Sequence, residues 1–424
     1  MDVTTADEPS EHRIPAPRES EPRLGSVPRV LRPRRAAPAD AVRPTRAEIN
    51  LEALRHNLHV TQKHAGRAHV WPVLKADGYG HGAPAVARTL ERAGARGFCV
   101  ALLEEAIELR DAGIRTPILV MGGYYGGAYA ELLARELVPV VYDEAGLEGF
   151  ARLVSAGDVE GPVGVHLKVD TGMARLGVTL RELPKFADRL LARPEVRVRG
   201  LMTHLAQADS ATLDDTRVQL GRFDEASALL ASRGIRAEVR HAANSAALLR
   251  GEGTFDAVRP GIAIFGHTPR LPGGPGVALG ERLSTELRPV MRVRTEVVAL
   301  RDLAVGENVG YGGTFTATRP SRIATIPIGY ADGYSRALSN KGAVLVRGAR
   351  APLVGVVSMD MAMIDVTDLP GVTLRDEAVV LGAQEGPLGK DVLWADELAA
   401  LAGTIPWEVL TSISRRVPRF YREP

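Results

Sequence analysis

Hydrophobic positions between about residues 70 and 265 form short apolar runs that alternate with amphipathic stretches, a pattern typical of alternating strands and helices. In one such stretch Leu147, Phe150, Ala151 and Val154 fall on a single helical face. The apolar runs predict eight strands, at residues 70–75, 97–103, 117–122, 137–142, 163–169, 198–205, 237–242 and 258–265. Eight strands with intervening helices predict an α/β fold, a parallel (β/α)8 barrel of the TIM type.

The pattern changes after about residue 285, where short β-branched runs alternate with Gly, Asp and Pro turns. The runs lie at residues 290–300, 322–328, 343–346, 353–357, 362–366 and 378–381, and a short helix is predicted at 395–402. We therefore expect a barrel over residues 45–285, followed by an antiparallel β-rich domain over residues 286–424.

The first 44 residues contain no aromatic side chain and are rich in Pro, Arg, Glu and Ala. Such a segment cannot bury enough apolar surface to fold, so residues 1–44 are predicted to be a disordered tail. Arg34 and Arg35 are not followed by an apolar run, which argues against an export signal. Folded structure is predicted from Arg46, with Asn50 capping a helix.

Composition restricts the possible partners and the compartment. The chain has 424 residues, 45% hydrophobic content and a net charge of +2, so neither nucleic acid nor a membrane is an expected partner. No apolar run approaches the length of a membrane span. Cys99 is the one cysteine, so no internal disulfide can form and a cytoplasmic location is expected. No metal site is expected.

Lys75 ends the first predicted strand and is followed by Gly78, Gly80 and Gly82, which break regular structure. A lysine at the end of a buried strand is costly unless its amine is used. Schiff-base chemistry uses such a lysine, because partial desolvation frees a nucleophilic amine. The alternative is a lysine whose stem lies on apolar surface while its amine reaches water.

Polar groups recur after the later strands as well. They include Lys168 and Arg175 near the fifth strand, His204 after the sixth, Asn244 and Ser245 after the seventh, and Arg259, Gly261 and Ile262 at the eighth. Because a barrel of this kind has its active site at the carboxyl ends of its strands, these groups predict a site there. Strand ends are generally polar, however, and Asn244-Ser245 alone is equally consistent with a helix cap.

The decapeptide at residues 73–82 as a whole resembles the pyridoxal-phosphate attachment signature of the alanine racemase family, and residues 306–315 resemble its second catalytic motif. The resemblance runs from about Arg46 to Tyr421. It implies a barrel followed by a β domain, with pyridoxal phosphate attached to Lys75. Removal of a proton from one face of Cα and delivery to the other requires two bases, and the resemblance implies that they are Lys75 and Tyr311.

The resemblance also implies a cofactor-binding set. Its members are Lys75, Tyr79, His204, Asn244, Ser245, Arg259, Gly261, Ile262 and Trp407. Tyr79, Ser245 and the backbone N–H groups of Gly261 and Ile262 would hold the phosphate. Arg259 would face the pyridine nitrogen, which must then stay unprotonated and accept the bond. The weaker electron sink that results favours racemisation over transamination or decarboxylation.

His204 is expected to bond Arg259 and hold it in position, the alternative being a histidine satisfied within the core. Arg175 resembles the arginine near the substrate carboxylate. Lys168 aligns with a lysine that is often carbamylated in the family and that orients this arginine. Without that modification two cations would lie close together, which is unfavourable.

In the β domain, Tyr330 and the pair Met359 and Asp360 resemble family segments that line the substrate access and the carboxylate side. Tyr311 belongs to the same domain, whereas Lys75 belongs to the barrel. The resemblance implies a head-to-tail homodimer in which Tyr311 of one chain completes the active site of the other.

Trp407 stands where the family most often has a tyrosine that contacts the cofactor phosphate. The indole N–H donates but cannot accept a hydrogen bond, and the larger ring reshapes the pocket. The function expected is racemisation of L- and D-alanine, with D-alanine supplied to peptidoglycan. Trp407 leaves open a racemase of another amino acid such as serine or lysine. Arg259 argues against a decarboxylase, and the β domain with Tyr311 argues against a non-catalytic pyridoxal-phosphate carrier.

Overall fold

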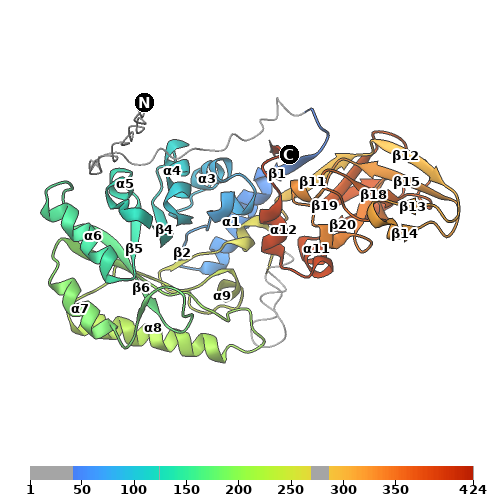
Figure 1. The fold of residues 1–424 in the computed structure, drawn as a ribbon. Helices are drawn as coiled ribbons and strands as arrows, with labels where there is room; N and C mark the ends of the chain where they lie inside the picture. Colours follow the sequence, from blue (N-terminus) through green and yellow to red (C-terminus); the bar gives the residue numbers. More distant parts are fainter. Residues whose placement is uncertain (1–41, 124, 269–285, 424) are drawn as a thin grey trace, which may run out of the picture. The chain divides into compact units, whose positions relative to one another are not determined.

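A computed structural model describes residues 42–123, 125–268 and 286–423 (Figure 1). Its first part is built on parallel strands in the order β2-β10-β9-β8-β6-β5-β4-β3, with a short strand β7 beside β6. The strands are β2 (His69–Val70), β3 (Phe98–Leu102), β4 (Ile118–Gly123), β5 (Val138–Val141), β6 (Val163–Asp170), β7 (Val178–Thr179), β8 (Val196–Met202), β9 (Val239–His241) and β10 (Ala257–Val258).

The two ends of this sheet join just after β2. Val73 bridges Cys99 of β3 in parallel, and the N–H of Leu74 donates to the Cys99 carbonyl over 2.8 Å. Because β2 pairs with β10 on its other side, the sheet closes on itself. The predicted (β/α)8 barrel is confirmed.

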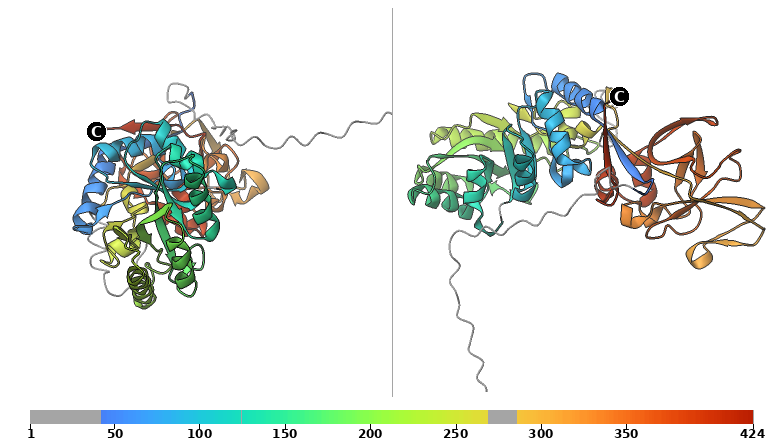
Figure 2. Two further views of the ribbon diagram at one scale, coloured as in Figure 1. Left: turned by 90° about the vertical axis from the view of Figure 1, so that its left-hand side faces the viewer. Right: turned by 90° about the horizontal axis from the view of Figure 1, so that it is seen from above.

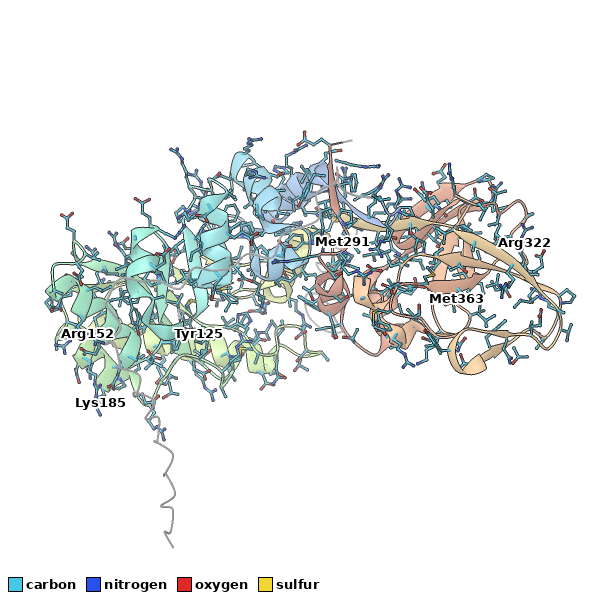
Figure 3. The ribbon with its side chains drawn as sticks, turned by 45° about the horizontal axis from the view of Figure 1, so that its top comes forward. Tyr125, Arg152, Lys185, Met291, Arg322 and Met363 are labelled. Atoms are coloured by element: carbon cyan, nitrogen blue, oxygen red, sulfur yellow. The ribbon has the colours of Figure 1, made fainter. Side chains whose placement is uncertain are left out.

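Helices lie around the outside of the barrel strands (Figure 2). They are α1 (Leu51–Ala65), α3 (Ala83–Arg92), α4 (Leu103–Asp111), α5 (Tyr129–Ala134), α6 (Glu144–Ser155), α7 (Leu183–Leu191), α8 (Asp214–Ser232) and α9 (Ser245–Leu249). As predicted, Asn50 caps α1 by accepting from the Ala53 N–H over 2.9 Å. Charged side chains such as Arg152 of α6 and Lys185 of α7 are exposed on their outer faces (Figure 3). Within the described ranges, no helix is long and apolar enough to cross a bilayer.

The first and last barrel strands are shorter than predicted. Residues 75–79 form α2 (Lys75–Tyr79), in which Ala76, Asp77, Gly78 and Tyr79 all have positive φ, so this turn is left-handed. The eighth strand ends at Val258, and the chain turns into η3 (Ile262–Phe265). Pro260 has no N–H to continue the strand ladder, which accounts for this early end.

The second part is a β domain, as predicted. Its main sheet has the order β17-β16-β19-β11-β1-β21, with β20 beside β19, and smaller sheets join β12-β15-β18 and β13-β14. The strands are β1 (Arg46–Asn50), β11 (Met291–Glu296), β12 (Ala299–Leu303), β13 (Asn308–Val309), β14 (Phe315–Thr316), β15 (Ser321–Ile326), β16 (Ala343–Val346), β17 (Ala349–Pro352), β18 (Ala362–Asp365), β19 (Glu377–Gly386), β20 (Gly389–Leu393) and β21 (Arg419–Arg422).

Helical segments complete this domain. They are η4 (Tyr311–Gly313), η5 (Tyr330–Asp332), η6 (Arg336–Leu338), α11 (Ala395–Ala402) and α12 (Pro406–Ser412). The predicted run 290–300 is two strands, β11 and β12, in different sheets. The predicted strand 353–357 is also wrong, since β17 ends at Pro352. Gly355 has φ +76, and a Cβ there would lie 2.7 Å from the Val309 carbonyl oxygen, so an extended strand cannot run through it.

Strand β1 lies outside the barrel to which the sequence analysis assigned it. It pairs antiparallel with β11 and parallel with β21, so the start and the end of the folded chain share the β-domain sheet. Just before β1, Arg43 forms an ion pair of 2.6 Å with the fully buried Asp332. The proposed tail lies, for residues 1–41, outside the described residues, as does the proposed boundary at residue 285. The domain limits therefore remain a prediction.

Candidate active site

A cavity of about 270 Å³ lies at the carboxyl ends of the barrel strands. It is lined by every residue of the predicted cofactor set, namely Lys75, Tyr79, His204, Asn244, Ser245, Arg259, Gly261, Ile262 and Trp407. Trp407 comes from α12 of the β domain, whereas the others follow barrel strands. The parallel topology thus gathers residues that are more than 300 positions apart in the sequence, such as Lys75 and Trp407.

Lys75 stands at the start of the left-handed turn α2, which is held by two carboxylates. The Ala76 N–H donates to Glu105 over 2.6 Å, and the Ala83 N–H donates to Asp77 over 2.8 Å. The Lys75 amine opens into the cavity. Desolvation by the surrounding protein lowers its pKa, the positive charge of Arg175 lowers it further, and Glu105 opposes both effects. A larger fraction of Lys75 is therefore the neutral, nucleophilic amine than for a lysine in water.

Hydrogen-bond donors also line this cavity. Burial raises the pKa of Tyr79, so its hydroxyl stays protonated and can donate. A Cβ at Gly261 would lie 2.1 Å from the Tyr79 hydroxyl oxygen, so glycine is required for this close approach. Ser245 Oγ accepts from the Gly261 N–H over 3.0 Å. Asn244 acts as a helix cap, the alternative role considered from the sequence. Its side chain caps α9 by accepting from the Ala247 N–H over 3.0 Å.

Arg259 is only 2% exposed, and its guanidinium group is fixed by the barrel. Nη1 donates to His241 Nδ1 over 2.6 Å, and Nη2 donates to the carbonyl oxygens of Thr203 and Ala242 over 2.8 and 3.1 Å. The prediction that His204 bonds Arg259 was therefore wrong, and His241 is the partner. The reason is geometric: His241 ends β9, beside Arg259 after β10, whereas His204 faces the cavity.

His241 extends this contact to a second histidine that the sequence analysis also missed. Its Nε2 lies 2.8 Å from His166 Nδ1. Arginine only donates, so neutral His241 accepts at Nδ1 and donates from Nε2 to His166. Burial and then Arg259 lower the pKa of His166 to about 4 and that of His241 well below its usual range. A Cβ at Gly200 would lie 2.3 Å from His166 Nδ1, so this glycine makes room for the imidazole.

The pKa of His204 reflects the positive charge around the cavity. Burial is the first cause that lowers its pKa, to about 3, and the charges of Arg259, Arg175, Lys168 and Lys75 follow. His204 is therefore neutral at physiological pH and is surrounded by cations. A cavity with this field favours an anionic ligand such as a phosphate or a carboxylate.

Lys168 is 5% exposed on β6. Burial, Arg175 and Arg259 together lower its pKa to about 8, whereas Asp170 raises it. Arg175 itself is exposed, and it lies near enough to Lys75, Lys168 and His204 to affect the pKa of each. The structure therefore brings Arg175 and Lys168 to the predicted site, although neither lines the cavity wall.

The predicted residues of the β domain lie on its surface. Tyr311 in η4 is 74% exposed. The N–H of Tyr330 donates to the Ser358 carbonyl over 3.1 Å and that of Ala331 to the Met359 carbonyl over 3.0 Å, so these two segments lie together. Asp360 pairs with Arg416 over 2.7 Å. Within the described part of one chain, none of Tyr311, Tyr330, Met359 and Asp360 lines the barrel cavity.

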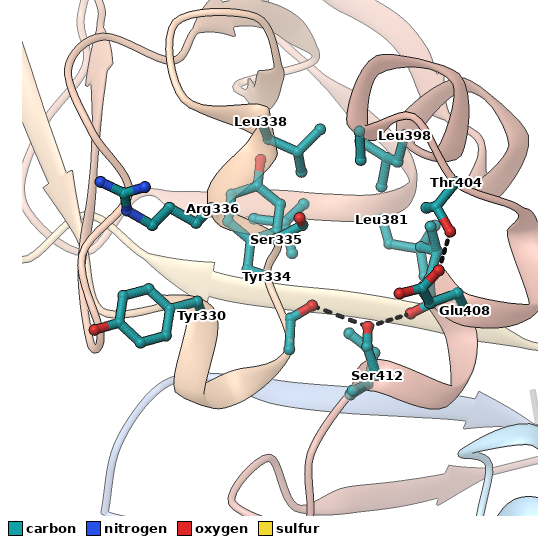
Figure 4. A pocket seen from close by; sticks show the side chains of 15 residues that line it. Tyr330, Tyr334, Ser335, Arg336, Leu338, Leu381, Leu398, Thr404, Glu408 and Ser412 are labelled. Carbon is teal, nitrogen blue, oxygen red and sulfur yellow. Dashed lines mark hydrogen bonds between the residues drawn. The ribbon is translucent and has the colours of Figure 1, made fainter. Parts of the chain in front are cut away.

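A second cavity, of about 290 Å³, lies inside the β domain (Figure 4). Its walls include Tyr334, Leu338, Leu381 and Leu398, and no lysine or histidine. Glu408 at its margin accepts a hydrogen bond from Thr404. The nucleophilic amine and the cationic field belong to the barrel cavity, which is the better candidate for catalysis. No cluster of three or more His, Cys, Asp or Glu side chains suited to a metal occurs among the described residues.

Comparisons with known proteins agree with this geometry. Residues 49–269 match the family model "Alanine racemase, N-terminal domain", and residues 290–421 match "Alanine racemase, C-terminal domain". A curated alanine racemase from Sorangium cellulosum is 58% identical over 390 residues, which cover 90% of this chain and 100% of the relative.

Solved structures of alanine racemases have a similar fold. An alanine racemase from Streptomyces lavendulae has a TM-score of 0.82 and 33% identity, covering 91% of this chain and 98% of that one. One from Bartonella henselae, described with covalently bound pyridoxal phosphate, has a TM-score of 0.78 and 31% identity, covering 89% and 99%. Because these relatives are described as alanine racemases, the comparisons do not favour a carrier or a decarboxylase as the function. The chain belongs to the alanine racemase family, isomerases that depend on pyridoxal phosphate.

Proposed function

We propose that this protein interconverts L- and D-alanine, with Lys75 and Tyr311 as the two bases that act on opposite faces of Cα. The observation that carries the proposal is the lysine of lowered pKa in a cationic cavity lined by hydrogen-bond donors. Pyridoxal phosphate, when bound, supplies an electron-withdrawing ring that acidifies the Cα proton. The relatives named alanine racemase support alanine as the substrate.

The residues present fit this cofactor. Lys75 offers an amine for covalent attachment, and Tyr79, Ser245 and the loop amides at Gly261 and Ile262 would hold the phosphate. His204 and Asn244 complete the walls, and Trp407 would close the cavity from α12. Every cation around His204 favours a ligand of negative charge.

Arg259 would face the ring nitrogen. Its remaining hydrogen-bonding capacity is limited to donation, because a guanidinium has no acceptor. The pKa of Arg259 is lowered by burial, to about 10, which still leaves it charged at neutral pH. A charged donor at this place would keep the ring nitrogen unprotonated and so would limit electron withdrawal. Such a site would favour return of the proton to Cα over side reactions.

Arg175, Tyr330, Met359 and Asp360 would bind the substrate, with Arg175 near its carboxylate. Lys168 would orient Arg175 as a carbamate. With a pKa of about 8, part of Lys168 is a neutral amine near neutral pH. The amine nitrogen would bond to the carbon of CO2 and lose a proton to water, leaving an anion in place of the buried cation. That anion would offset the positive charges of Arg175 and Arg259.

A homodimer would bring the two bases together. Tyr311 is exposed, and the Tyr330 and Met359 segments expose apolar side chains beside each other. Burial of such a patch against a second copy is favourable. We propose a head-to-tail dimer in which each barrel cavity receives the Tyr311 of the other protomer. We also propose a cytoplasmic enzyme, consistent with its free, buried Cys99, that supplies D-alanine for peptidoglycan.

The test is an incubation of the purified protein and pyridoxal phosphate with L-alanine in D2O, with L-serine and L-lysine in parallel. Chiral chromatography should show D-alanine, and the α-proton signal of alanine should disappear. Tyr311→Phe should reduce racemisation by about 10² or more and leave cofactor binding intact. Full turnover in that variant would exclude Tyr311 as a base. An absence of α-proton exchange in all three amino acids would contradict the function itself.

A further inference from the structure

The turn that carries Lys75 is strained. Ala76, Asp77 and Tyr79 have φ of 52°, 57° and 52°, in the left-handed region that side chains other than glycine seldom adopt. Such a conformation persists only when its surroundings hold it. Because Lys75 and Tyr79 border the turn and both line the cavity, whatever holds the turn also sets the direction of these two side chains.

Part of the restraint comes from the barrel. His81 is fully buried and stays neutral, since burial lowers its pKa to about 3. Its Nδ1 lies 3.0 Å from the Gly78 carbonyl oxygen and 2.9 Å from that of Tyr79, so the ring nitrogen donates to the turn. These contacts, with those of the Asp77 and Glu105 carboxylates, hold the turn from the barrel side.

The residue that ends the turn, Gly80, is held by a side chain from the other end of the described chain. Arg419, on β21 of the β-domain sheet, is 9% exposed. Its Nε donates to the Gly80 carbonyl oxygen over 2.9 Å. Its Nη atoms donate to the carbonyl oxygens of Ser414, Val417 and Ile413 over 2.5, 2.6 and 2.6 Å. One guanidinium group therefore joins the Lys75 turn to the segment that follows α12.

Helix α12 itself also lies against the end of the turn. Gly80 has φ +80, and a Cβ there would lie 2.4 Å from the carbonyl oxygen of Leu410. Leu410 belongs to α12, the helix that carries Trp407 to the cavity. The position of α12 and the position of the turn are thus coupled through Gly80, and Arg419 holds both.

We infer that Arg419 is a positioning residue for Lys75, which rests on the proposed function of Lys75 as the cofactor-binding lysine. Arg419 does not line the cavity. It fixes the carbonyl of Gly80 and thereby the left-handed turn, the partly desolvated setting of the Lys75 amine and the placement of Trp407. Lysine is a poor substitute, because a single ammonium lacks the fork that reaches several carbonyl oxygens at once.

The experiment compares full-length wild type, Arg419→Met and Arg419→Lys. The rate at which pyridoxal phosphate attaches to the apoprotein is followed by visible absorbance as a function of pH, since attachment requires the neutral Lys75 amine. Without Arg419 the turn should relax and expose that partly desolvated amine further to water, so the midpoint pH should rise by about one unit and affinity should fall about tenfold or more. Arg419→Lys should recover part of both changes.

Arg110 provides a matched control. It also donates to four carbonyl oxygens, those of Arg135, Ile114, Thr116 and Glu136, over 2.8 to 3.0 Å. These lie in loops that precede barrel strands, at the end opposite the cavity. Arg110→Met should lower thermal stability and leave the midpoint pH unchanged.

Equal loss of stability in Arg419→Met and Arg110→Met, with both midpoints and affinities equal to those of wild type, would overturn the inference. If Arg419→Met does not fold, the midpoint pH of Arg419→Lys tests the inference, because an unchanged midpoint and affinity in that variant would overturn it. Because the measured step is attachment to the apoprotein, an absence of racemisation in wild type would contradict the proposed function and leave this comparison valid.

Discussion

Arg259 depends on neighbours that carry no charge of their own. His241 accepts from Arg259 and passes a hydrogen bond to His166, and both rings are buried in the barrel. Because each neutral imidazole has one donor and one acceptor nitrogen, Arg259 fixes the tautomers of both His241 and His166. The two neutral histidines hold the Arg259 guanidinium in place without neutralising its charge.

His241→Phe removes the acceptor and leaves a charged donor buried without its partner. We expect a loss of about 2–3 kcal/mol in the free energy of unfolding and a lower kcat, since Arg259 can then turn away from the cavity. His241→Gln is the matched control, because its amide can accept from Arg259 and donate to His166. Urea unfolding and steady-state kinetics measure both quantities. If phenylalanine and glutamine behave alike, the hydrogen bond to Arg259 is unimportant.

Lys168 predicts a pH dependence whose sign follows from its lowered pKa. The folded amine titrates at about 8 and the unfolded one at its ordinary value of 10.5. Below pH 8 both states carry the proton, and the folded state bears the cost of a buried cation. Between these values the unfolded state binds more protons, so stability rises with pH. Relative to Lys168→Met, the apoprotein in CO2-free buffer should gain on the order of 1–3 kcal/mol from pH 7.5 to 10.

Chemical unfolding of the two apoproteins at several pH values measures this gain. The difference in unfolding free energy between them cancels the titration of all other groups that are unchanged. A difference that stays flat, or that falls as the pH rises, would contradict a buried cationic Lys168.

At the scale of elements, the barrel was predictable because each strand is a short apolar run and each helix has one apolar face. The site followed from topology, since parallel strands place their carboxyl ends together. The hand of the Lys75 turn was not predictable. The glycines predicted a break in regular structure, yet Ala76, Asp77 and Tyr79 also take positive φ. The neighbouring His81 holds the turn locally, and Glu105 and Arg419 hold it from distant parts of the chain.

His241 was missed for a related reason. It ends β9, a strand of three residues, and its sequence neighbours give no sign of the arginine that it meets. The contact is made because β9 and β10 are adjacent strands, with His241 paired to Ala257. A strand pair must be known before its cross-strand side chains can be matched. His204, which is also a histidine after a strand, was the plausible but wrong choice.

At the scale of the whole molecule, the two ends of the folded chain help to build the site. Strand β1 pairs with β21, which bears Arg419, and Arg43 pairs with Asp332, the last residue of the η5 segment that begins at Tyr330. Arg416 adds a link between Asp332 and Asp360, at 3.6 and 2.7 Å. The surface that carries Tyr330 and Asp360 is therefore shaped by residues from both termini of the fold, and it is the surface proposed to face a second copy.

A shared active site predicts complementation between two inactive variants. Lys75→Ala removes one of the two proposed bases and Tyr311→Phe the other, so each homodimer should be inactive. In a mixed dimer one cavity has both substitutions and the other has neither, because the cavity with Lys75 receives Tyr311 from the partner. Random exchange of equal amounts makes half of the dimers mixed, each with one intact site, and should restore about a quarter of wild-type activity.

The measurement is racemisation after the two variants are mixed under conditions that allow subunit exchange, with each variant alone as the control. A site completed within one chain predicts a different result, since every cavity in the mixture would then lack one base. Mixing would restore nothing, and the exposed position of Tyr311 would need another explanation. Recovery that scales with the measured fraction of mixed dimers would place the two bases in different protomers.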